Sequence, residues 1–211
     1  MRVSESRYSR DIRRIDLARR LIRHRVRTQW ICAWTGLSGE RVRNLYHSYS
    51  QTQPARHRAR GPSPRRTFTL LRSPRLQNEA SALGGIAYRL GLIPAQPVRN
   101  PEVVLAGVDL GEQLCKAFEL YHQVVPGAGF TMEQFILLVF ALAERKELDM
   151  ALCESCRGFL IVDCTGASQR RCPTCRKTLE TEADEPLADE ASSDAVDEPN
   201  EYQQSLFDSE S

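Results

Sequence analysis

The sequence lacks the long apolar segments that membrane proteins need. Its longest uninterrupted apolar run is nine residues, Phe135 to Ala143, whereas a membrane span needs roughly 18 or more. The basic N-terminus is not followed by an apolar stretch of the kind that signal peptides contain. We therefore expect a cytoplasmic protein with no membrane partner.

The sequence also lacks recognisable catalytic motifs. It has no glycine-rich phosphate-binding loop and no evident nucleophile with a paired base. It has four histidines, and none of them lies between residues 153 and 178, where cysteines are concentrated. We therefore predict that the protein is not an enzyme, and we assign no catalytic residue.

Lysine is scarce, and the charge is distributed unevenly along the chain. Residues 1–75 contain 19 arginines, no lysine and four acidic residues, which gives a net charge of +15. Residues 76–152 carry −4, residues 153–178 carry +3, and residues 179–211 carry −12 without a single cation. The basic first block favours an anionic partner such as nucleic acid, although a solvated arginine-rich surface is the alternative.

Seven cysteines are an odd number in a chain without an export signal, which favours metal binding over a disulfide framework. Four of them follow the spacing C-x2-C-x15-C-x2-C, which is typical of a zinc ribbon, and Phe159 to Val162 would form one strand of it. Four sulfur ligands leave no open coordination position, so one structural Zn²⁺ per chain is predicted. Paired redox dithiols are the rival interpretation. The predicted ligands are Cys153, Cys156, Cys172 and Cys175, whereas Cys164 is a spare thiol and Cys32 and Cys115 are small core residues.

Apolar periodicity elsewhere predicts a mainly α fold. Thr131 and Gln134 form a capping-box pair at the start of the last predicted helix, and Gly107 and Gly111 mark where the preceding segment could divide in two. The expected helices cover residues 11–26, 28–34, 40–49, 76–90, about 103–125, and 131–147.

The second and third helices form a helix-turn-helix candidate. Gly36 would be the turn glycine, and Ser38 would cap the second helix of the pair. Apolar residues fall where two helices must pack, at Ile31, Leu37, Val42 and Leu45. The same alignment projects Arg41, Arg43, Asn44 and His47 outward, and arginine and asparagine suit guanine and adenine in the major groove. Any amphipathic helical hairpin gives a similar pattern, which is the alternative.

These features divide the chain into five regions. They are a basic helical region at 1–49, a Pro-rich basic connector without regular structure at 50–75, a helical core and subunit interface at 76–150, the zinc ribbon at 151–178, and a disordered acidic tail at 179–211. The all-apolar centre of the helix 131–147 must be covered on every side, either within this chain or by another subunit. The acidic tail could fold back over the basic N-terminal block.

Several of these segments together resemble the FlhC family, the C subunit of the flagellar master transcriptional activator. They are LSGERVRNLYHSY, LCKAFELYHQV and FILLVFALAERKELDMALCESCRGFLIV, followed by the second cysteine pair. The resemblance covers about residues 10–178, and the acidic tail departs from it. It implies a cytoplasmic FlhD4C2 heterohexamer with FlhD that binds promoter DNA and recruits RNA polymerase to flagellar operons. It also implies a zinc site on Cys153, Cys156, Cys172 and Cys175.

The predicted function is therefore that of a DNA-binding transcriptional activator subunit. The helix 132–147 would face FlhD or the second C subunit. The alternative is an RNA-binding or ribosome-associated zinc-ribbon protein, because basic arms and zinc ribbons serve both nucleic acids. Competition between duplex DNA and structured RNA would separate the two.

Overall fold

The computed structural model describes residues 2–52, 66–165 and 170–183, and this part of the chain is mainly helical, as predicted. The chain begins with three helices and continues with a short 3-10 turn, four further helices, a β-hairpin and a last helix. The elements are α1 (Arg2–Arg23), α2 (Thr28–Thr35), α3 (Gly39–Thr52), η1 (Thr67–Leu70), α4 (Pro74–Arg89), α5 (Pro101–Val104), α6 (Val108–Val124), α7 (Met132–Glu144), β1 (Leu148–Leu152), β2 (Phe159–Asp163) and α8 (Pro173–Ala183).

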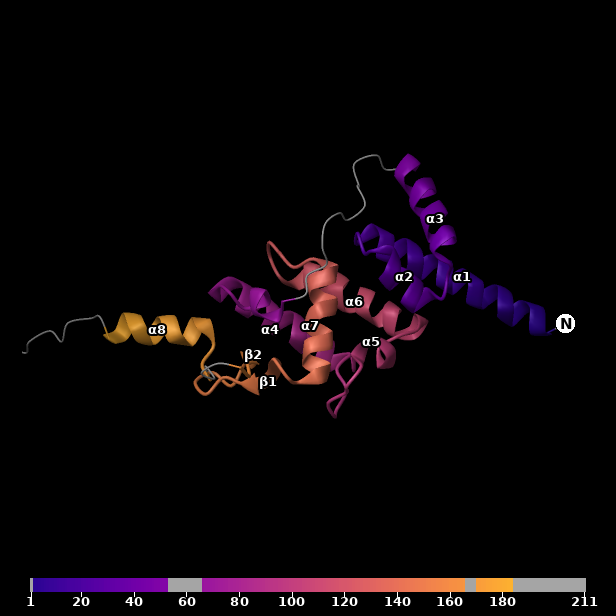
Figure 1. Cartoon of the computed structure of the whole chain (residues 1–211). Coiled ribbons are helices and arrows are strands. Elements are labelled where there is room, and N and C mark those ends of the chain that lie inside the picture. The colour runs from indigo at the N-terminus through magenta and orange to yellow at the C-terminus, as the bar shows by residue number, and fades with distance from the viewer. Residues whose placement is uncertain (1, 53–65, 166–169, 184–211) are drawn as a thin grey trace, which may run out of the picture.

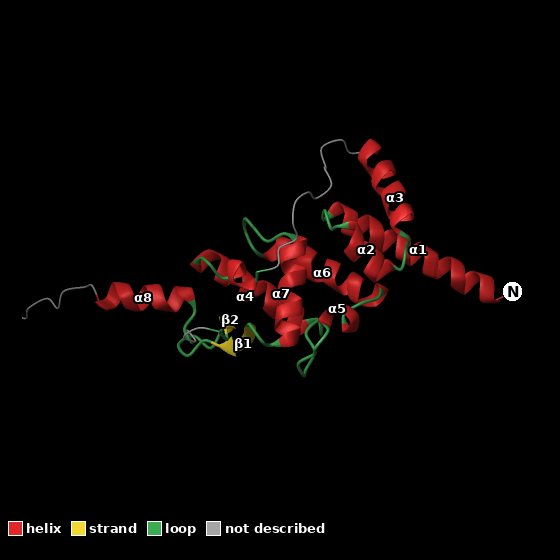
Figure 2. Ribbon diagram, in the orientation of Figure 1, coloured by secondary structure: helices red, strands yellow, loops and turns green. Residues whose placement is uncertain are grey.

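The molecule is elongated, with three groups of elements along its length (Figure 1). Helices α1–α3, which we call the head, lie at one end, and helices α4–α7, which we call the body, lie in the middle. The hairpin and α8 (residues 148–183), which we call the metal unit, lie at the other end. Figure 2 shows the two strands of this hairpin, in yellow, beside α4 and α7.

Helix α7 is the central element of the body. The predicted capping box is present, because Gln134 N–H donates to Thr131 Oγ1 and Thr131 N–H donates to Gln134 Oε1. Arg145 adopts a left-handed conformation (φ 52°) and ends the helix at Glu144, earlier than expected. Eight of the 13 residues of α7 are buried, and the helix contacts α4, α5, α6, η1 and β1. The chain thus covers most of α7 by itself, and the part left half-buried includes Leu137 and Phe140; the interface with another subunit stays a prediction.

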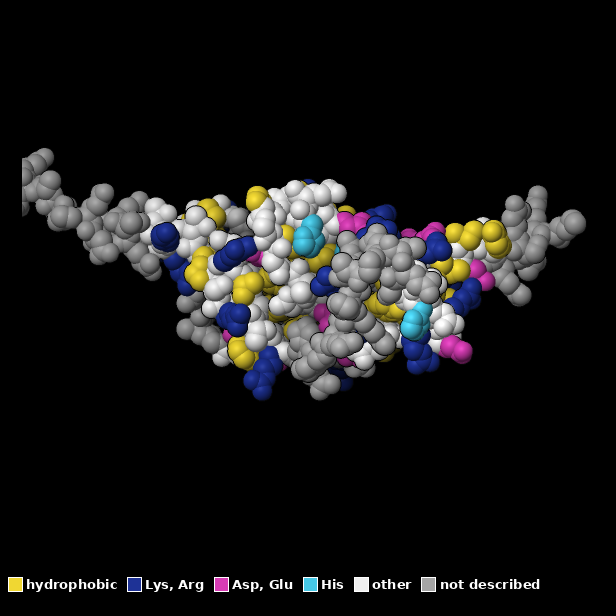
Figure 3. Space-filling view, turned by 90° about the horizontal axis from the view of Figure 1, so that it is seen from above, with side chains coloured by type: hydrophobic (Ala, Val, Ile, Leu, Met, Phe, Trp, Pro, Cys, Tyr) yellow, Lys and Arg dark blue, Asp and Glu magenta, His cyan; other side chains and the backbone are white. Residues whose placement is uncertain are grey.

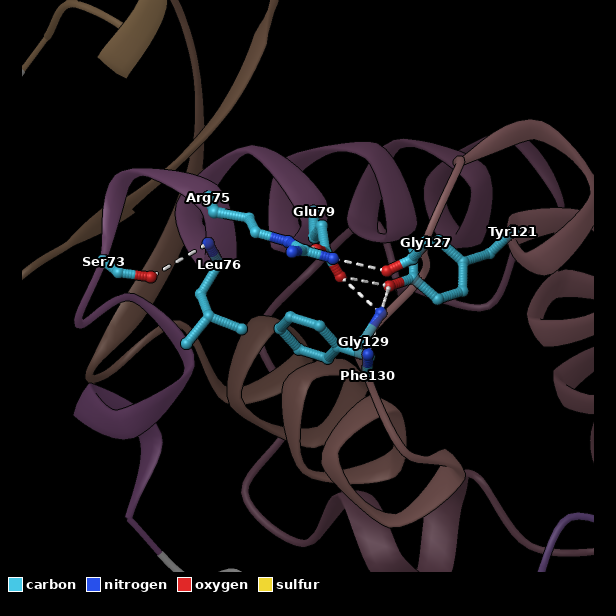
Figure 4. Close-up of polar contacts among 8 residues, drawn as sticks. All are labelled: Ser73, Arg75, Leu76, Glu79, Tyr121, Gly127, Gly129 and Phe130. Carbon is cyan, nitrogen blue, oxygen red and sulfur yellow. Dashed lines mark hydrogen bonds and ion pairs between the residues drawn. The ribbon is translucent and has the colours of Figure 1, made fainter.

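A buried carboxylate ties α4 to the loop between α6 and α7. Glu79 is 5% exposed, and its oxygens accept hydrogen bonds from Tyr121 Oη at 2.5 Å, Gly129 N–H at 2.8 Å and Arg75 Nε at 2.7 Å. Figure 4 shows these groups converging on Glu79. Burial alone would raise the pKa of Glu79, but the bonds from Tyr121, Arg75 and Gly129 outweigh it and lower the pKa.

The head packs on the body through a close contact between helices. A Cβ built on Gly111 of α6 would lie 2.8 Å from Leu17 Cδ2 and 3.2 Å from Trp34 Cβ, so this glycine lets α1 and α2 approach α6. Trp34 Nε1 also donates to the Leu105 carbonyl at 2.7 Å. Gly107 (φ 104°) separates α5 from α6, as expected, whereas Gly111 lies within α6.

Three sequence predictions need correction. The predicted connector 50–75 has regular structure at both ends, because α3 continues to Thr52, η1 occupies 67–70 with Leu70 fully buried, and α4 starts at Pro74. Residues 53–65 lie outside the described part.

The bounds of two helices also differ from those expected. Helix α1 starts nearer the N-terminus than expected and ends at Arg23. Helix α8 extends four residues past Leu179, where the tail was predicted to begin, and the tail prediction for 184–211 concerns residues outside the described ones.

No helix in the described residues is both long enough and apolar enough to cross a membrane.

Candidate functional site

The four predicted cysteine ligands come together at one end of the molecule. Their sulfur atoms all lie within 4.8 Å of one another, and Cys156 Sγ lies 3.9 Å from Cys172 Sγ. Four thiolates at these separations can enclose a single metal ion in a tetrahedral arrangement. No other group of three or more cysteine, histidine or acidic side chains in the described residues is placed to do so.

The first cysteine pair lies in the turn of the β-hairpin. Strands β1 and β2 are antiparallel, with Leu152 opposite Phe159. Between them the chain closes a tight knuckle, in which Arg157 takes a left-handed conformation (φ 58°) and Cys153 N–H donates to the Gly158 carbonyl at 2.8 Å. The sequence predicted only the strand over 159–162, and the pairing with Leu148–Leu152 is new.

The second cysteine pair lies at the start of α8 instead of on a second hairpin. Pro173 is the first residue of the helix, and Cys172 precedes it. Cys172 Sγ accepts a hydrogen bond from the Cys175 N–H at 3.5 Å, so the sulfur takes the place of a helix-capping oxygen. The Cys172 N–H donates in turn to Cys153 Sγ at 3.3 Å, which links the two pairs.

These hydrogen bonds shift the pKa values of Cys153 and Cys175 in opposite directions. The backbone N–H groups of Cys156 and Cys172 stabilise the thiolate of Cys153 and lower its pKa to about 6. The pKa of Cys175 is raised to about 12, first because of its hydrogen bond with Cys172. The hydrogen bonds thus favour the thiolate form at Cys153 and the thiol form at Cys175, and a thiol that binds a metal must release its proton.

The metal unit is fixed to α4 by polar and apolar contacts. Ile161 N–H donates to Ser81 Oγ at 3.1 Å, and Arg176 Nη2 donates to Gln77 Oε1 at 2.9 Å. A Cβ on Gly84 would lie 2.6 Å from Ile161 Cδ1, so the absence of a side chain at Gly84 lets β2 pack closely on α4.

The four predicted DNA-contacting residues share the outer side of α3. Arg41, Arg43, Asn44 and His47 are all exposed. In the described part of the chain, none of their side chains takes part in a hydrogen bond or an ion pair.

The packing side of α3 holds the apolar residues that the helix-turn-helix pattern assigned to it. Ile31, Leu37 and Val42 are buried, and Leu45 packs against the core. Gly36 is left-handed (φ 66°), and Ser38 Oγ accepts from the Arg41 N–H at 3.3 Å, as predicted for the turn and the cap.

Other arginines of the basic N-terminal block are engaged within the chain. Arg13, Arg20 and Arg27, spaced seven residues apart, form ion pairs with acidic residues of α6 and α7. The pairs are Arg13 with Asp109 (2.7 Å) and Glu112 (2.8 Å), Arg20 with Glu119 (2.8 Å), and Arg27 with Glu133 (3.0 Å). The sequence-based predictions missed this stripe, although the seven-residue spacing of Arg13 and Arg20 places them on one face of α1. Arg27 lies beyond the end of α1, directly before α2.

Glu119 also binds a histidine at this interface. His24 Nε2 lies 3.1 Å from Glu119 Oε1, and burial lowers the pKa of His24 despite the neighbouring carboxylate. Together these contacts divide the cations of the head into one set that faces the body and another that faces outward. Figure 3 shows Lys, Arg, Asp and Glu side chains near one another toward the α1 end.

No protein-family model matches this chain, and no curated protein matches it.

Proposed function

We propose that the protein is a non-enzymatic, DNA-binding transcriptional activator subunit of the FlhC type. The observation that carries this proposal is the outer side of α3, where Arg41, Arg43, Asn44 and His47 are exposed and have no side-chain partner among the described residues. Three of these side-chain types have donors that pair with base edges or phosphates. The helix that bears them follows a tight turn and is held by a buried apolar side, as recognition helices require.

The metal is proposed to be one structural Zn²⁺ per chain, held by Cys153, Cys156, Cys172 and Cys175. Tetrahedral zinc with bonds of about 2.3 Å to sulfur places its ligands roughly 3.8 Å apart, close to the 3.9 Å between Cys156 and Cys172. When bound, the ion supplies a rigid crosslink between the hairpin and α8. An all-sulfur tetrahedral site also suits iron, so elemental analysis of the purified protein tests the assignment, and stoichiometric iron in place of zinc would refute it.

The proposed assembly follows the resemblance stated above. The subunit would act in the cytoplasm with FlhD as an FlhD4C2 heterohexamer at flagellar promoters and would recruit RNA polymerase. Because most of α7 is covered within the chain, FlhD would bind the half-buried part of this helix or another surface. Co-expression with a candidate FlhD, followed by purification and footprinting on a flagellar promoter, tests this part, and failure to co-purify would refute it.

DNA binding itself is tested by substitution and salt titration of the same complex. If the arginine contacts a base, we expect Arg41→Ala and Arg43→Ala each to reduce the difference in binding free energy between specific and mismatched DNA by about 1–3 kcal/mol. If it contacts a phosphate, the slope of the logarithm of the binding constant against the logarithm of the salt concentration should instead fall by about one. Arg99→Ala is the matched control, because Arg99 is an exposed arginine of the body. A preference for structured RNA over duplex DNA would instead support the RNA-binding alternative.

A further inference from the structure

An open apolar groove lies beside the metal site, where α4 meets β2. Its volume is about 830 Å³. The walls come from α4, from Asn78 onward, from α6 and from the hairpin, and the edge next to the metal site is formed by Cys156 and Cys172. The main apolar residues lining it are Ile86, Tyr88, Leu90, Leu120 and Phe159.

The groove exposes large side chains that a folded chain usually covers. Tyr88 is 54% exposed, and Leu120 is 39% exposed. The Tyr88 and Phe159 rings lie 6.2 Å apart and form part of one wall. Apolar side chains that gather around a hollow of this size are typical of a docking surface rather than of scattered surface residues.

The charge around the groove is basic. Apart from the two cysteine ligands at its edge, Arg89 is the one charged residue among the described residues that line the groove, and no aspartate or glutamate lines it. Two further exposed arginines are direct chain neighbours of lining residues: Arg157 lies between Cys156 and Gly158, and Arg171 precedes Cys172. An occupant that combines apolar anchors with negative charge would therefore match this surface best.

The C-terminal part of this chain has that composition. Residues 184–211 contain ten acidic residues and no lysine or arginine. Large apolar residues are isolated at Leu187 and Val196, but three of them, Tyr202, Leu206 and Phe207, fall within six residues, and acidic residues flank this cluster on both sides. The segment 202–207 thus offers the anchors, and its flanks offer the charge.

The segment can also reach the groove. Helix α8 starts directly after Cys172, which lines the groove, and its 11 residues carry the chain about 16 Å away. The 18 residues between Ala183 and Tyr202 can span up to about 60 Å when extended. A return path of this length needs no change in the described structure.

We propose that residues 202–207 of the chain's own C-terminal segment dock in the groove between α4, α6 and β2. Their apolar side chains cover the exposed wall around Tyr88 and Leu120, and their acidic flanks meet Arg89 and the arginines beside the two cysteine pairs. This docking keeps the acidic segment next to the metal unit, at the opposite end of the molecule from the head (Figure 1). It is an alternative to the hypothesis that the tail covers the basic N-terminal block.

Site-specific photo-crosslinking of the full-length protein tests the proposal. A benzophenone amino acid replaces Phe207 and, as a control within the tail, replaces Val196 in a separate protein. On irradiation at low concentration, we expect the probe at 207 to crosslink within the monomer to peptides that contain residues 86–90, 120 or 158–159. The probe at 196 should give these products at least several-fold less often.

Groove variants identify the contact. Leu120→Glu and, separately, Tyr88→Glu should reduce the crosslinks from position 207 several-fold, because each adds a negative charge on an exposed wall. Val103→Glu is the matched control, since Val103 is 75% exposed on α5 and does not line the groove. Circular dichroism checks that each variant is folded, and the two independent groove positions keep the test decisive if one variant is not.

Three results would overturn the proposal. Crosslinks that join two copies would show that the tail docks in trans, and crosslinks to residues 8–49 would place it on the head. The absence of groove crosslinks from a folded protein would show that the groove has another occupant. None of these readouts depends on DNA binding, so the crosslinking result tests the docking proposal independently of the proposed function.

Discussion

The body and the metal unit are neighbours in the fold, yet they differ in what holds them together. The body and the head share one continuous core that includes Trp34, Tyr121, Phe135 and most of α7. In the metal unit, Leu148 and Ile161 join this core, whereas Leu160 and Cys153 are buried outside it. A segment with so few buried apolar residues cannot offset its conformational entropy by packing alone.

This difference implies that the two regions respond to different perturbations. The stability of the metal unit should depend on the bound metal ion, since metal binding contributes directly to the folding free energy of small cysteine-rich units. The body should depend on close packing and on its buried polar network. Substitutions that affect one region and leave the other intact therefore test the comparison.

The largest effect is expected from removal of a metal ligand. Structural zinc contributes of order 10–16 kcal/mol in small zinc-binding peptides, so Cys153→Ser should abolish stoichiometric metal binding and unfold the hairpin and α8. Amide hydrogen exchange should then accelerate in β1 and β2, while α6 and α7 keep their protection. Cys164→Ser is the matched control, because Cys164 is exposed and lies outside the cluster. Equal loss of protection in α7 would show that the two regions fold as one unit.

The next effect concerns the contact between head and body. Gly111→Ala places a methyl group against Leu17 and the Cβ of Trp34, and such overpacking typically destabilises a protein by about 1–3 kcal/mol. Gly39→Ala is the control, since a Cβ there has no neighbour within 4 Å. Denaturant unfolding should show a loss for Gly111→Ala alone, with metal content unchanged in both. A neutral Gly111→Ala would mean that the head moves away from α6 without cost.

Much of this architecture could be predicted from local sequence, because local physical chemistry determines it. The capping box at Thr131, the left-handed Gly36 and the cysteine spacing each describe a feature built from residues close in sequence. The mainly α fold followed from the same kind of signal. For the proposed contacts of α3, the sequence identified the exposed side but not what it binds.

The remaining features depend on partners that are distant in sequence. Strand β1 has the sequence LDMAL, whose strand propensity is weak, and it forms by pairing with β2. The start of α8 was signalled by Pro173 at the first helical position. The helix was missed because residues up to 178 were assigned to the zinc ribbon and those from Leu179 onward to the acidic tail. The apolar composition of α7 indicated that the helix must be buried on all sides, but it did not indicate whether this chain or another subunit buries it.

A smaller effect is expected from the buried carboxylate of the body. Glu79→Gln keeps the shape of the side chain but removes the charge that Tyr121 and Arg75 stabilise, so the free energy of unfolding should fall by about 1–3 kcal/mol at neutral pH. Metal content should not change. A variant as stable as the wild type would show that the network is not needed to hold α4 against the loop after α6.

The same carboxylate should give the body a pH dependence. Because the pKa of Glu79 is lower in the folded state, its contribution to stability is fully present above the ordinary glutamate pKa and is lost as the pH falls through the folded-state value. The stability difference between wild type and Glu79→Gln should therefore shrink on acidification. Thermal unfolding of both proteins between neutral pH and about pH 3 measures this, and a difference that grows in acid contradicts it.

The smallest effect is expected at the ion pairs between α1 and α6. Arg20 and Glu119 are only partly buried, so Arg20→Gln should cost about 1 kcal/mol or less, and added salt should reduce the loss. Arg19→Gln is the matched control, because Arg19 pairs with Asp16 on the exposed surface of the same helix. If Arg20→Gln instead destabilised the protein as much as Gly111→Ala, the ion pairs would contribute as much as apolar packing to the stability of the contact between head and body. Arg41 and Arg43 of α3 differ from Arg13, Arg20 and Arg27, because they form no ion pair within the described residues, so their substitution should leave stability unchanged.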